Sequence, residues 1–280
     1  MNKKNYQLIT SQDQTFFQVI SECYKQKFII YELFKRDIKI SYGYSYFGPL
    51  YFILLPIIQT FVFNFLLINI NSSLDSPSNF INIMCGMIIW NFFATSALKC
   101  STTFISNTKT IKKVYYSRLI FFINPILMGL LNFFVQFIIF YFFLIYFKVQ
   151  GVSIDLISWK LLLIPFVLIY VIIFSLGIGF IVSSLSLKTR DVIYLLNFFF
   201  QMYLFLTPVL YPIAVLKGNL LVFNYFNPAT IFIDLFKYIF FDGLLIPKIF
   251  MLVNLIVVSI LFLIGLKGFI KSIKILDDNL

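Results

Sequence analysis

Long apolar runs recur along this 280-residue chain, and they limit its possible folds more than any other feature. A helix needs about 20 mostly apolar residues to cross the hydrocarbon core of a bilayer. Charged residues make up only 12% of the chain, about half the fraction of a typical soluble domain. The sequence therefore predicts an all-α integral membrane protein with six transmembrane helices, at residues 47–69, 81–104, 119–147, 160–185, 191–211 and 247–270.

The segment between the fifth and sixth runs, residues 212–243, is apolar but broken by Pro212, Gly218, Pro228 and Gly243. Proline and glycine interrupt helices. Irregular backbone at membrane depth is tolerated only where it is buried in protein or lines a cavity. Two short re-entrant or interfacial helices are therefore expected here, on the outer side of the membrane.

Lysine and arginine are divided unevenly between the two sides of this predicted topology. Seventeen of the 22 fall on the side of the chain ends and five on the other side. Cytoplasmic loops carry an excess of basic residues, so both ends are expected in the cytoplasm. The net charge of +11 is also typical of nucleic-acid binders, but loops that face anionic lipid explain it better in a membrane protein. No nucleic-acid partner is predicted.

A further helix is expected over residues 15–40, before the first run. Apolar residues recur there at helical spacing, with charged residues between them. An amphipathic helix of this kind usually lies in the membrane interface, either as a surface anchor or as a mechanical element. Arg36 and Lys39 either bind a lipid diphosphate or are ordinary basic residues that extend toward the membrane surface, and the second interpretation is favoured. Asp191 is better explained as a cap of the fifth helix than as a functional switch.

The segment 105–118 reads ISNTKTIKKVYYSR and separates two strongly apolar runs. Asn107 or Thr108 can cap a short helix, and its apolar residues are spaced along one face. The basic residues alone would serve as a topology signal. A helix with a mixed basic and apolar face would instead bind a groove of a cytoplasmic partner, through Lys109, Ile111, Lys112, Lys113, Val114, Tyr115 and Arg118.

Several functional classes lack the residues that they need. No glycine opens a Walker A loop, and the chain contains no histidine. Its three cysteines, Cys23, Cys85 and Cys100, have neither the spacing of a metal site nor that of a disulfide framework. The chain is therefore expected to be no enzyme and to hold no cofactor or metal of its own.

Four stretches follow one another in a characteristic order. The first, RDIKISYGYSYFGPLYFILLPIIQTFVFNFLL, leads from a basic segment through a glycine into a proline-containing span. The second is WNFFATSALKCSTTFISNTKTIKKVYYSRLIFFINP, and the last two are FSLGIGFIVSSLSLKTRDVIYLLNFFFQMYLFLTPVLYP and FNPATIFIDLFKYIFFDG. Together they resemble the ABC-2 type permeases that export bacterial O-antigen, capsule or teichoic acid, over nearly the whole chain.

The resemblance implies that residues 1–280 form one ABC-2 type transmembrane domain in the bacterial inner (plasma) membrane. Two copies would form a channel above two separate ATPase subunits, which bind ATP and Mg. The helix over residues 15–40 and the segment 105–118, the latter as a coupling helix, would receive the motion of those subunits. The substrate would be a glycan or polyol-phosphate chain on a polyprenyl diphosphate lipid, with O-antigen favoured over capsule or teichoic acid. A permease for a drug or another lipid, and an energy-independent scramblase or channel, remain alternatives.

A channel for a hydrated glycan needs flat aromatic surfaces with occasional amides. Two predicted spans carry such stripes. The chain has 38 phenylalanines and 17 tyrosines, so aromatic stripes arise easily by chance, and the glutamines are the stronger candidates because an amide facing lipid needs a partner. The candidate channel residues are Phe52, Gln59 and Phe63 in the first span and Tyr194, Phe198, Gln201 and Phe205 in the fifth.

Overall fold

The computed structural model describes residues 25–43, 48–70, 76–108, 117–152, 156, 158–241 and 246–278. All regular secondary structure within these ranges is helical, which confirms the all-α prediction there. The long helices are α3 (Gly48–Ile70), α4 (Pro77–Ser101), α7 (Ile120–Val149), α8 (Ile164–Ser186), α9 (Asp191–Leu206) and α12 (Lys248–Asp278). The shorter helices are α2 (Lys27–Tyr42), α5 (Thr103–Ser106), η2 (Trp159–Leu163), η3 (Ile213–Val215), α10 (Asn219–Phe226) and α11 (Pro228–Phe240).

Four helical stretches in the described part of the chain are long and apolar enough to cross a membrane. They are Pro77–Ser101, Ile120–Val149, Trp159–Ser186 and Lys248–Ile273. Two shorter apolar stretches, Leu54–Asn69 and Asp191–Leu206, fall in the other two predicted spans. The protein is thus a helical, multi-pass membrane protein by length and composition.

Helix α9 ends at Leu206, five residues before the end of the predicted span 191–211. The backbone of Thr207 is extended (φ −95°, ψ 150°), and a proline follows it. The ring of Pro208 disfavours helical geometry in the residue before it, so the helix stops at Leu206. The segment 207–211 is a turn rather than a last helical turn.

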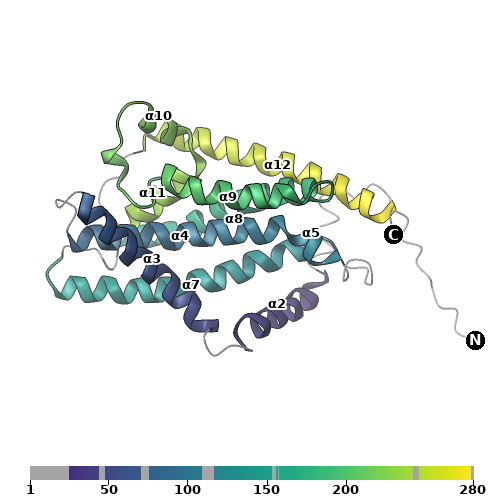
Figure 1. The fold of residues 1–280 in the computed structure, drawn as a ribbon, viewed down its shortest axis with the longest axis horizontal. Helices are drawn as coiled ribbons and strands as arrows, with labels where there is room; N and C mark the ends of the chain where they lie inside the picture. The colour runs from purple at the N-terminus through teal and green to yellow at the C-terminus, as the bar shows by residue number, and fades with distance from the viewer. Residues whose placement is uncertain are drawn as a thin grey trace, which may run out of the picture.

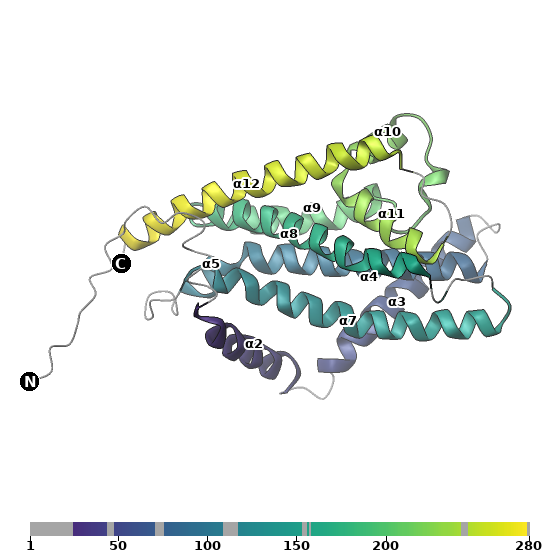
Figure 2. The same ribbon diagram turned by 180° about the vertical axis from the view of Figure 1, so that it is seen from behind.

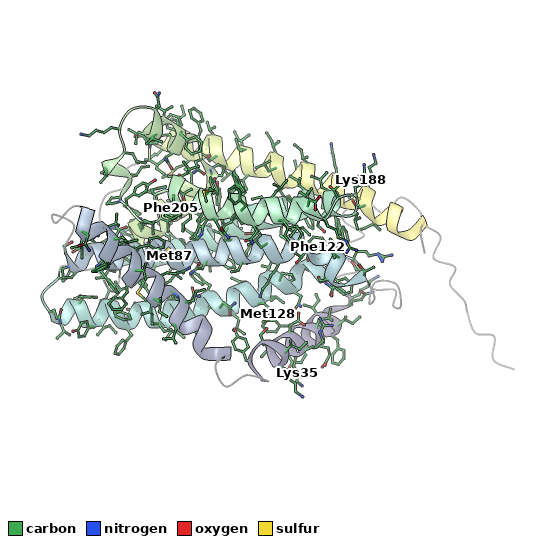
Figure 3. All side chains as sticks on the ribbon, viewed as in Figure 1. Lys35, Met87, Phe122, Met128, Lys188 and Phe205 are labelled. Atoms are coloured by element: carbon green, nitrogen blue, oxygen red, sulfur yellow. The ribbon has the colours of Figure 1, made fainter. Side chains whose placement is uncertain are left out.

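The long helices lie side by side along the long axis of the molecule, with α3 crossing the others obliquely (Figures 1 and 2). Helix α5 and Lys188, in the turn between α8 and α9, lie near the end where α12 finishes (Figure 3). Helices α10 and α11 lie at the opposite end. The fold therefore has two distinct ends, one with α5 and the other with α10 and α11, which fall in the predicted re-entrant region.

The core is built around aromatic rings of α4. The ring of Phe93 stacks on Phe174 of α8 at 4.9 Å between centroids, and it also contacts Phe200 of α9 and Phe232 of α11. Trp90 extends this cluster toward the end of α9. A sequence with this many large aromatic side chains can thus join four helices at one point, since offset and edge contacts each add about 0.5–1.5 kcal/mol.

Helices α8 and α12 approach each other closely because both carry glycine at the contact. A Cβ atom at Gly265 would lie 2.6 Å from the backbone oxygen of Gly177, and one at Gly177 would lie 3.2 Å from the backbone of Phe262. Small residues allow backbones in a membrane to pack directly against one another. The α8–α12 pair is therefore fixed by backbone contact.

Candidate functional site

The two predicted channel stripes meet at one point in the structure. Phe63 of α3 and Phe205 of α9 contact edge to face, with 6.0 Å between ring centroids. In Figure 1 both helices lie on the near side of the molecule, and Figure 2 shows them behind α4 and α8. The predicted channel residue Phe52 lies in α3, in a stretch whose side chains the structure does not describe.

Helix α9 has one buried and one exposed face. Phe200 and Tyr203 are buried against Trp90. The predicted channel residues lie on the exposed face: Tyr194 is 75% exposed, Phe198 61% and Phe205 54%, and Gln201 is exposed as well. The structure therefore brings the predicted α9 stripe together as one continuous aromatic surface with an amide in it.

Gln59 has a partner that the sequence analysis did not identify. The side-chain amide of Asn91 in α4 donates to Gln59 Oε1 at 3.1 Å. A second amide pair joins the same helices, since Asn79 Nδ2 donates to Asn64 Oδ1 at 3.4 Å. Asn91 and Asn64 are isolated amides within apolar runs of the sequence. Such amides need a hydrogen-bond partner, and this requirement could have indicated the contact between the two helices. The half-buried Gln59 thus lies at the α3–α4 contact.

Helix α2 is attached to the helical bundle by polar groups. Asn124 Nδ2 of α7 donates to Asp37 at 2.5 Å, and the Tyr42 hydroxyl donates to Asn132 of α7. Asp37 also forms an ion pair with its neighbour Arg36, at 2.7 Å. Burial raises the pKa of the Tyr42 phenol above its ordinary value. No residue of α2 is fully buried, although the half-buried Leu33 packs against a core cluster that contains Phe121 and Phe122, so polar contacts and partial apolar packing together attach the helix.

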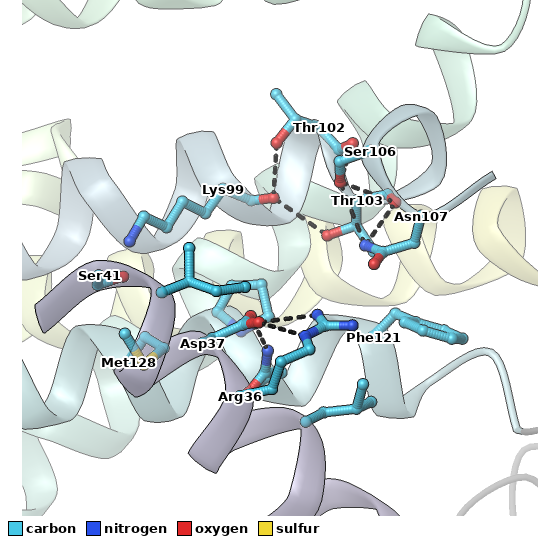
Figure 4. A pocket seen from close by; sticks show the side chains of 14 residues that line it. Arg36, Asp37, Ser41, Lys99, Thr102, Thr103, Ser106, Asn107, Phe121 and Met128 are labelled. Atoms are coloured by element: carbon cyan, nitrogen blue, oxygen red, sulfur yellow. Dashed lines mark hydrogen bonds and ion pairs between the residues drawn. The ribbon is translucent and has the colours of Figure 1, made fainter. Parts of the chain in front are cut away.

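A cavity of about 360 Å³ lies between α2, α4, α5 and α7. Arg36 and Asp37 line it from α2, and Lys99 lines it from α4 (Figure 4). Asn124 lines it from α7. Two side chains of opposite charge, Asp37 and Lys99, thus line the same space. Lys39, the other predicted lipid-diphosphate residue, is exposed in the last turn of α2 and does not line the cavity.

Most of the predicted coupling helix lies outside the described residues. This applies to Lys109, Ile111, Lys112, Lys113, Val114 and Tyr115, whereas Arg118 is described, in the turn that leads into α7. The backbone N–H of Ser117 donates to the side-chain oxygen of Gln26, the residue before α2, at 3.0 Å. The end of the predicted coupling segment therefore contacts the start of α2.

At the opposite end, Lys237 of α11 holds the turn that follows α9. Its ammonium group is buried and donates to the carbonyl oxygens of Pro208, Val209 and Tyr211 at 2.7, 3.1 and 3.4 Å. These carbonyls belong to the turn after α9, and a buried carbonyl without a hydrogen-bond partner is costly. The buried cation therefore fixes the end of α9 to α11.

The start of α11 is tied to α9 as well. Asn227 caps the helix by accepting from the backbone N–H of Ala229 at 2.9 Å, and Pro228 occupies the first helical position. The hydroxyl of Tyr203 in α9 donates to the same Asn227 oxygen. Asp191, predicted as a cap, is the first residue of α9, where a carboxylate faces the positive end of the helix dipole.

These features define a multi-pass helical membrane protein. It has an exposed aromatic face on α9, and polar contacts attach α2 to α7. The profile of the family described as ABC-2 type transporter matches residues 29–241, and the chain belongs to that family. It is similar to O-antigen export system permease protein RfbA of Klebsiella pneumoniae, with 27% identity over 82% of this chain and 83% of the relative. A protein of the same name from Myxococcus xanthus is 22% identical over 91% of this chain and 96% of the relative.

Proposed function

We propose that this chain is the permease subunit of an ATP-driven exporter that moves lipid-linked O-antigen across the bacterial inner membrane. The main support is that the relatives named as O-antigen export permeases align with at least 82% of the chain. ATP and Mg are bound by a separate ATPase subunit in this proposal. The substrate carries its glycan on a polyprenyl diphosphate.

In this proposal α3 and α9 join the four candidate spans, so that six helices cross the membrane. Both chain ends then lie in the cytoplasm, as the distribution of basic residues predicts, and α10 and α11 form the external re-entrant region. Cysteines introduced as Asn107→Cys and Lys188→Cys should react with an impermeant maleimide only from the cytoplasm. Asn219→Cys should react only from outside, and labelling of that cysteine from the cytoplasm would contradict the topology.

Two copies of the chain enclose the glycan path between their aromatic faces. The contact between Phe63 and Phe205 supports this arrangement, because it joins the stripes of α3 and α9 into one surface. Aromatic rings offer flat surfaces to sugar rings, and Gln201 adds a group that can exchange hydrogen bonds with hydroxyls. The exposed apolar side chains of α9 are unfavourable in contact with water, and a second copy buries them in this arrangement.

The transport experiment uses a bacterium whose own O-antigen permease gene is deleted but whose ATPase subunit and glycan synthesis remain. Expression of this chain with the ATPase subunit encoded beside it should restore surface O-antigen. The double variant Gln59→Leu/Gln201→Leu should lower export while membrane insertion and copurified ATPase remain unchanged. Unchanged export in this variant would remove the two glutamines from the path, and no restoration by the wild-type chain would refute the substrate assignment.

The segment 105–118 and α2 bind the ATPase subunits in this proposal. The variant Ile111→Ser/Val114→Ser/Tyr115→Ser keeps every charge of the segment and removes its apolar face. It should insert normally but lose ATPase copurification, because each buried apolar side chain contributes about 1.5–3 kcal/mol to such a contact. Wild-type amounts of copurified ATPase would leave the segment as a topology signal only.

A further inference from the structure

The way in which α2 is attached to α7 suggests a mechanical role for two polar residues. In the described part of the chain, hydrogen bonds connect α2 and the residue before it with α7 and the turn that leads into it. They are Gln26 with the backbone of Ser117, Asp37 with Asn124, and Tyr42 with Asn132. Their order along α2 matches their order along the start of α7, so α2 is held in one register against that helix.

The two α7 residues in these contacts are more deeply buried than any residue of α2. Asn124 and Asn132 are each only 6% exposed, whereas α2 has no buried residue. A buried amide without a partner loses its hydrogen bonds to water and gains none in return. Separation of α2 from α7 would break the hydrogen bonds of both amides, and this opposes detachment.

Asp37 is the centre of this attachment. It accepts from Asn124 of α7, pairs with Arg36 of its own helix and lines the same cavity as Lys99 of α4. A hydrogen bond to a charged group is stronger than one between neutral groups. The Asp37–Asn124 contact is thus the strongest of the three, and it lies beside the cavity that separates α2 from α4.

Both elements that are proposed to bind the ATPase lead to the same helix. The segment 105–118 continues directly into α7 along the chain, and α2 is bound to α7 by side chains. We propose that α7 is the helix through which ATPase movement enters the membrane domain, and that Asp37 and Asn124 are positioning residues that make α2 move together with α7. This inference rests on the proposed function.

An exchange of the two groups tests the inference. Asn124→Asp places a second carboxylate beside Asp37, and the two negative charges repel each other. Export should fall at least tenfold, with ATPase copurification retained. The reciprocal variant Asp37→Asn/Asn124→Asp restores one amide and one carboxylate and should return export to within about threefold of wild type. Gln150→Glu makes the same amide-to-carboxylate change at the exposed other end of α7 and should have no effect.

A second measurement reports attachment without relying on transport. Cysteines introduced as Tyr42→Cys and Asn132→Cys, with Cys23→Ser, should be joined by a short bismaleimide in the assembled complex. Asn124→Asp should reduce this cross-linking and the reciprocal exchange should restore it. The native Cys85 and Cys100 are buried.

The outcomes separate the two proposals. Loss of cross-linking in Asn124→Asp with undiminished export overturns the inference, and so does a reciprocal variant that assembles but regains neither signal. A wild-type chain that exports no O-antigen refutes the proposed function instead, and the cross-linking then decides whether Asp37 and Asn124 attach α2 to α7. Parallel loss and recovery of both signals supports the inference.

Discussion

Helices α2 and α11 are both short and lie outside the four candidate spans, yet they are held in opposite ways. Ten of the 13 residues of α11 are buried, including Phe232 and Phe236. None of the 16 residues of α2 is buried. Helix α11 also supplies a buried cation to the turn after α9, whereas α2 relies on hydrogen bonds near the surface.

The comparison indicates at which end of the protein displacement of a helix costs more free energy. Burial of one large apolar side chain contributes about 1.5–3 kcal/mol, and a typical hydrogen bond contributes about 0.5–1.5 kcal/mol net. Displacement of α11 would expose many side chains at once and disrupt the core around Phe93. Displacement of α2 would break a few polar contacts. The end with α2 is therefore the end where movement is least costly.

The largest effect is expected at Lys237. Lys237→Met removes the cation that donates to three carbonyl groups in the turn after α9, and each hydrogen bond to a charged group contributes about 1.5–3 kcal/mol. The free energy of unfolding should fall by about 3 kcal/mol or more, measured as a lower midpoint of thermal unfolding in detergent. Lys248→Met, an exposed lysine at the start of α12, should leave the midpoint unchanged. Equal midpoints for the two variants would contradict the fixed-end interpretation.

A smaller loss is expected at Gly86 of α4. A Cβ atom there would lie 2.5 Å from the backbone oxygen of Val209 and 3.1 Å from Lys237 Cε, so the turn after α9 would have to shift. Gly86→Ala should lower the free energy of unfolding by about 1–3 kcal/mol. The matched variant Gly268→Ala meets its nearest atom at 3.6 Å and should stabilise α12 by up to about 1 kcal/mol. A stabilising Gly86→Ala would show that the turn is free to move.

In α2 the expected effects are local. Tyr42→Phe removes one hydrogen bond, worth about 0.5–1.5 kcal/mol, which corresponds to a roughly 2- to 12-fold change in the population of detached α2. Trypsin cleavage after the exposed residues Lys35 and Arg36 should accelerate by that factor, while the unfolding midpoint stays within error of wild type. A large fall of the midpoint would show that α2 is part of the core.

The smallest effect is a dependence on pH. Burial raises the pKa of Tyr42 in the attached state, so the attached state holds its proton when the detached state has lost it. Attachment should therefore be constant below about pH 10 and weaken as the pH rises above that ordinary phenol value. A fluorophore on Lys35→Cys should report this change, and Tyr42→Phe should abolish it.

Apolar length was sufficient to predict most helices. The expected spans 119–147 and 247–270 correspond to α7 and α12, because a run of apolar residues has few alternatives to a helix in a membrane. The sequence also predicted which face of α9 carries Phe198 and Phe205. The contact between Phe63 and Phe205 depends on how α3 crosses α9, which no local pattern determines.

Two lysines show what local patterns could not predict. Lys160 and Lys237 are two of the five basic residues that the predicted topology assigns to the outer side. Both are buried: Lys160 lies 4.7 Å from the ring centroid of Tyr238, and the partners of Lys237 are backbone carbonyls. Neither backbone carbonyls nor a ring from a distant segment appears as a motif, so these interactions became visible only in the folded chain.

The glycine contact between α8 and α12 has a consequence for lateral access. Where Gly177 and Gly265 meet, backbone touches backbone, and a lipid tail or a sugar ring has no gap to pass through. In the proposed function the cargo is lipid-linked and enters from the bilayer. At the Gly177–Gly265 contact α8 and α12 leave no opening for such cargo, whereas the aromatic face of α9 is exposed.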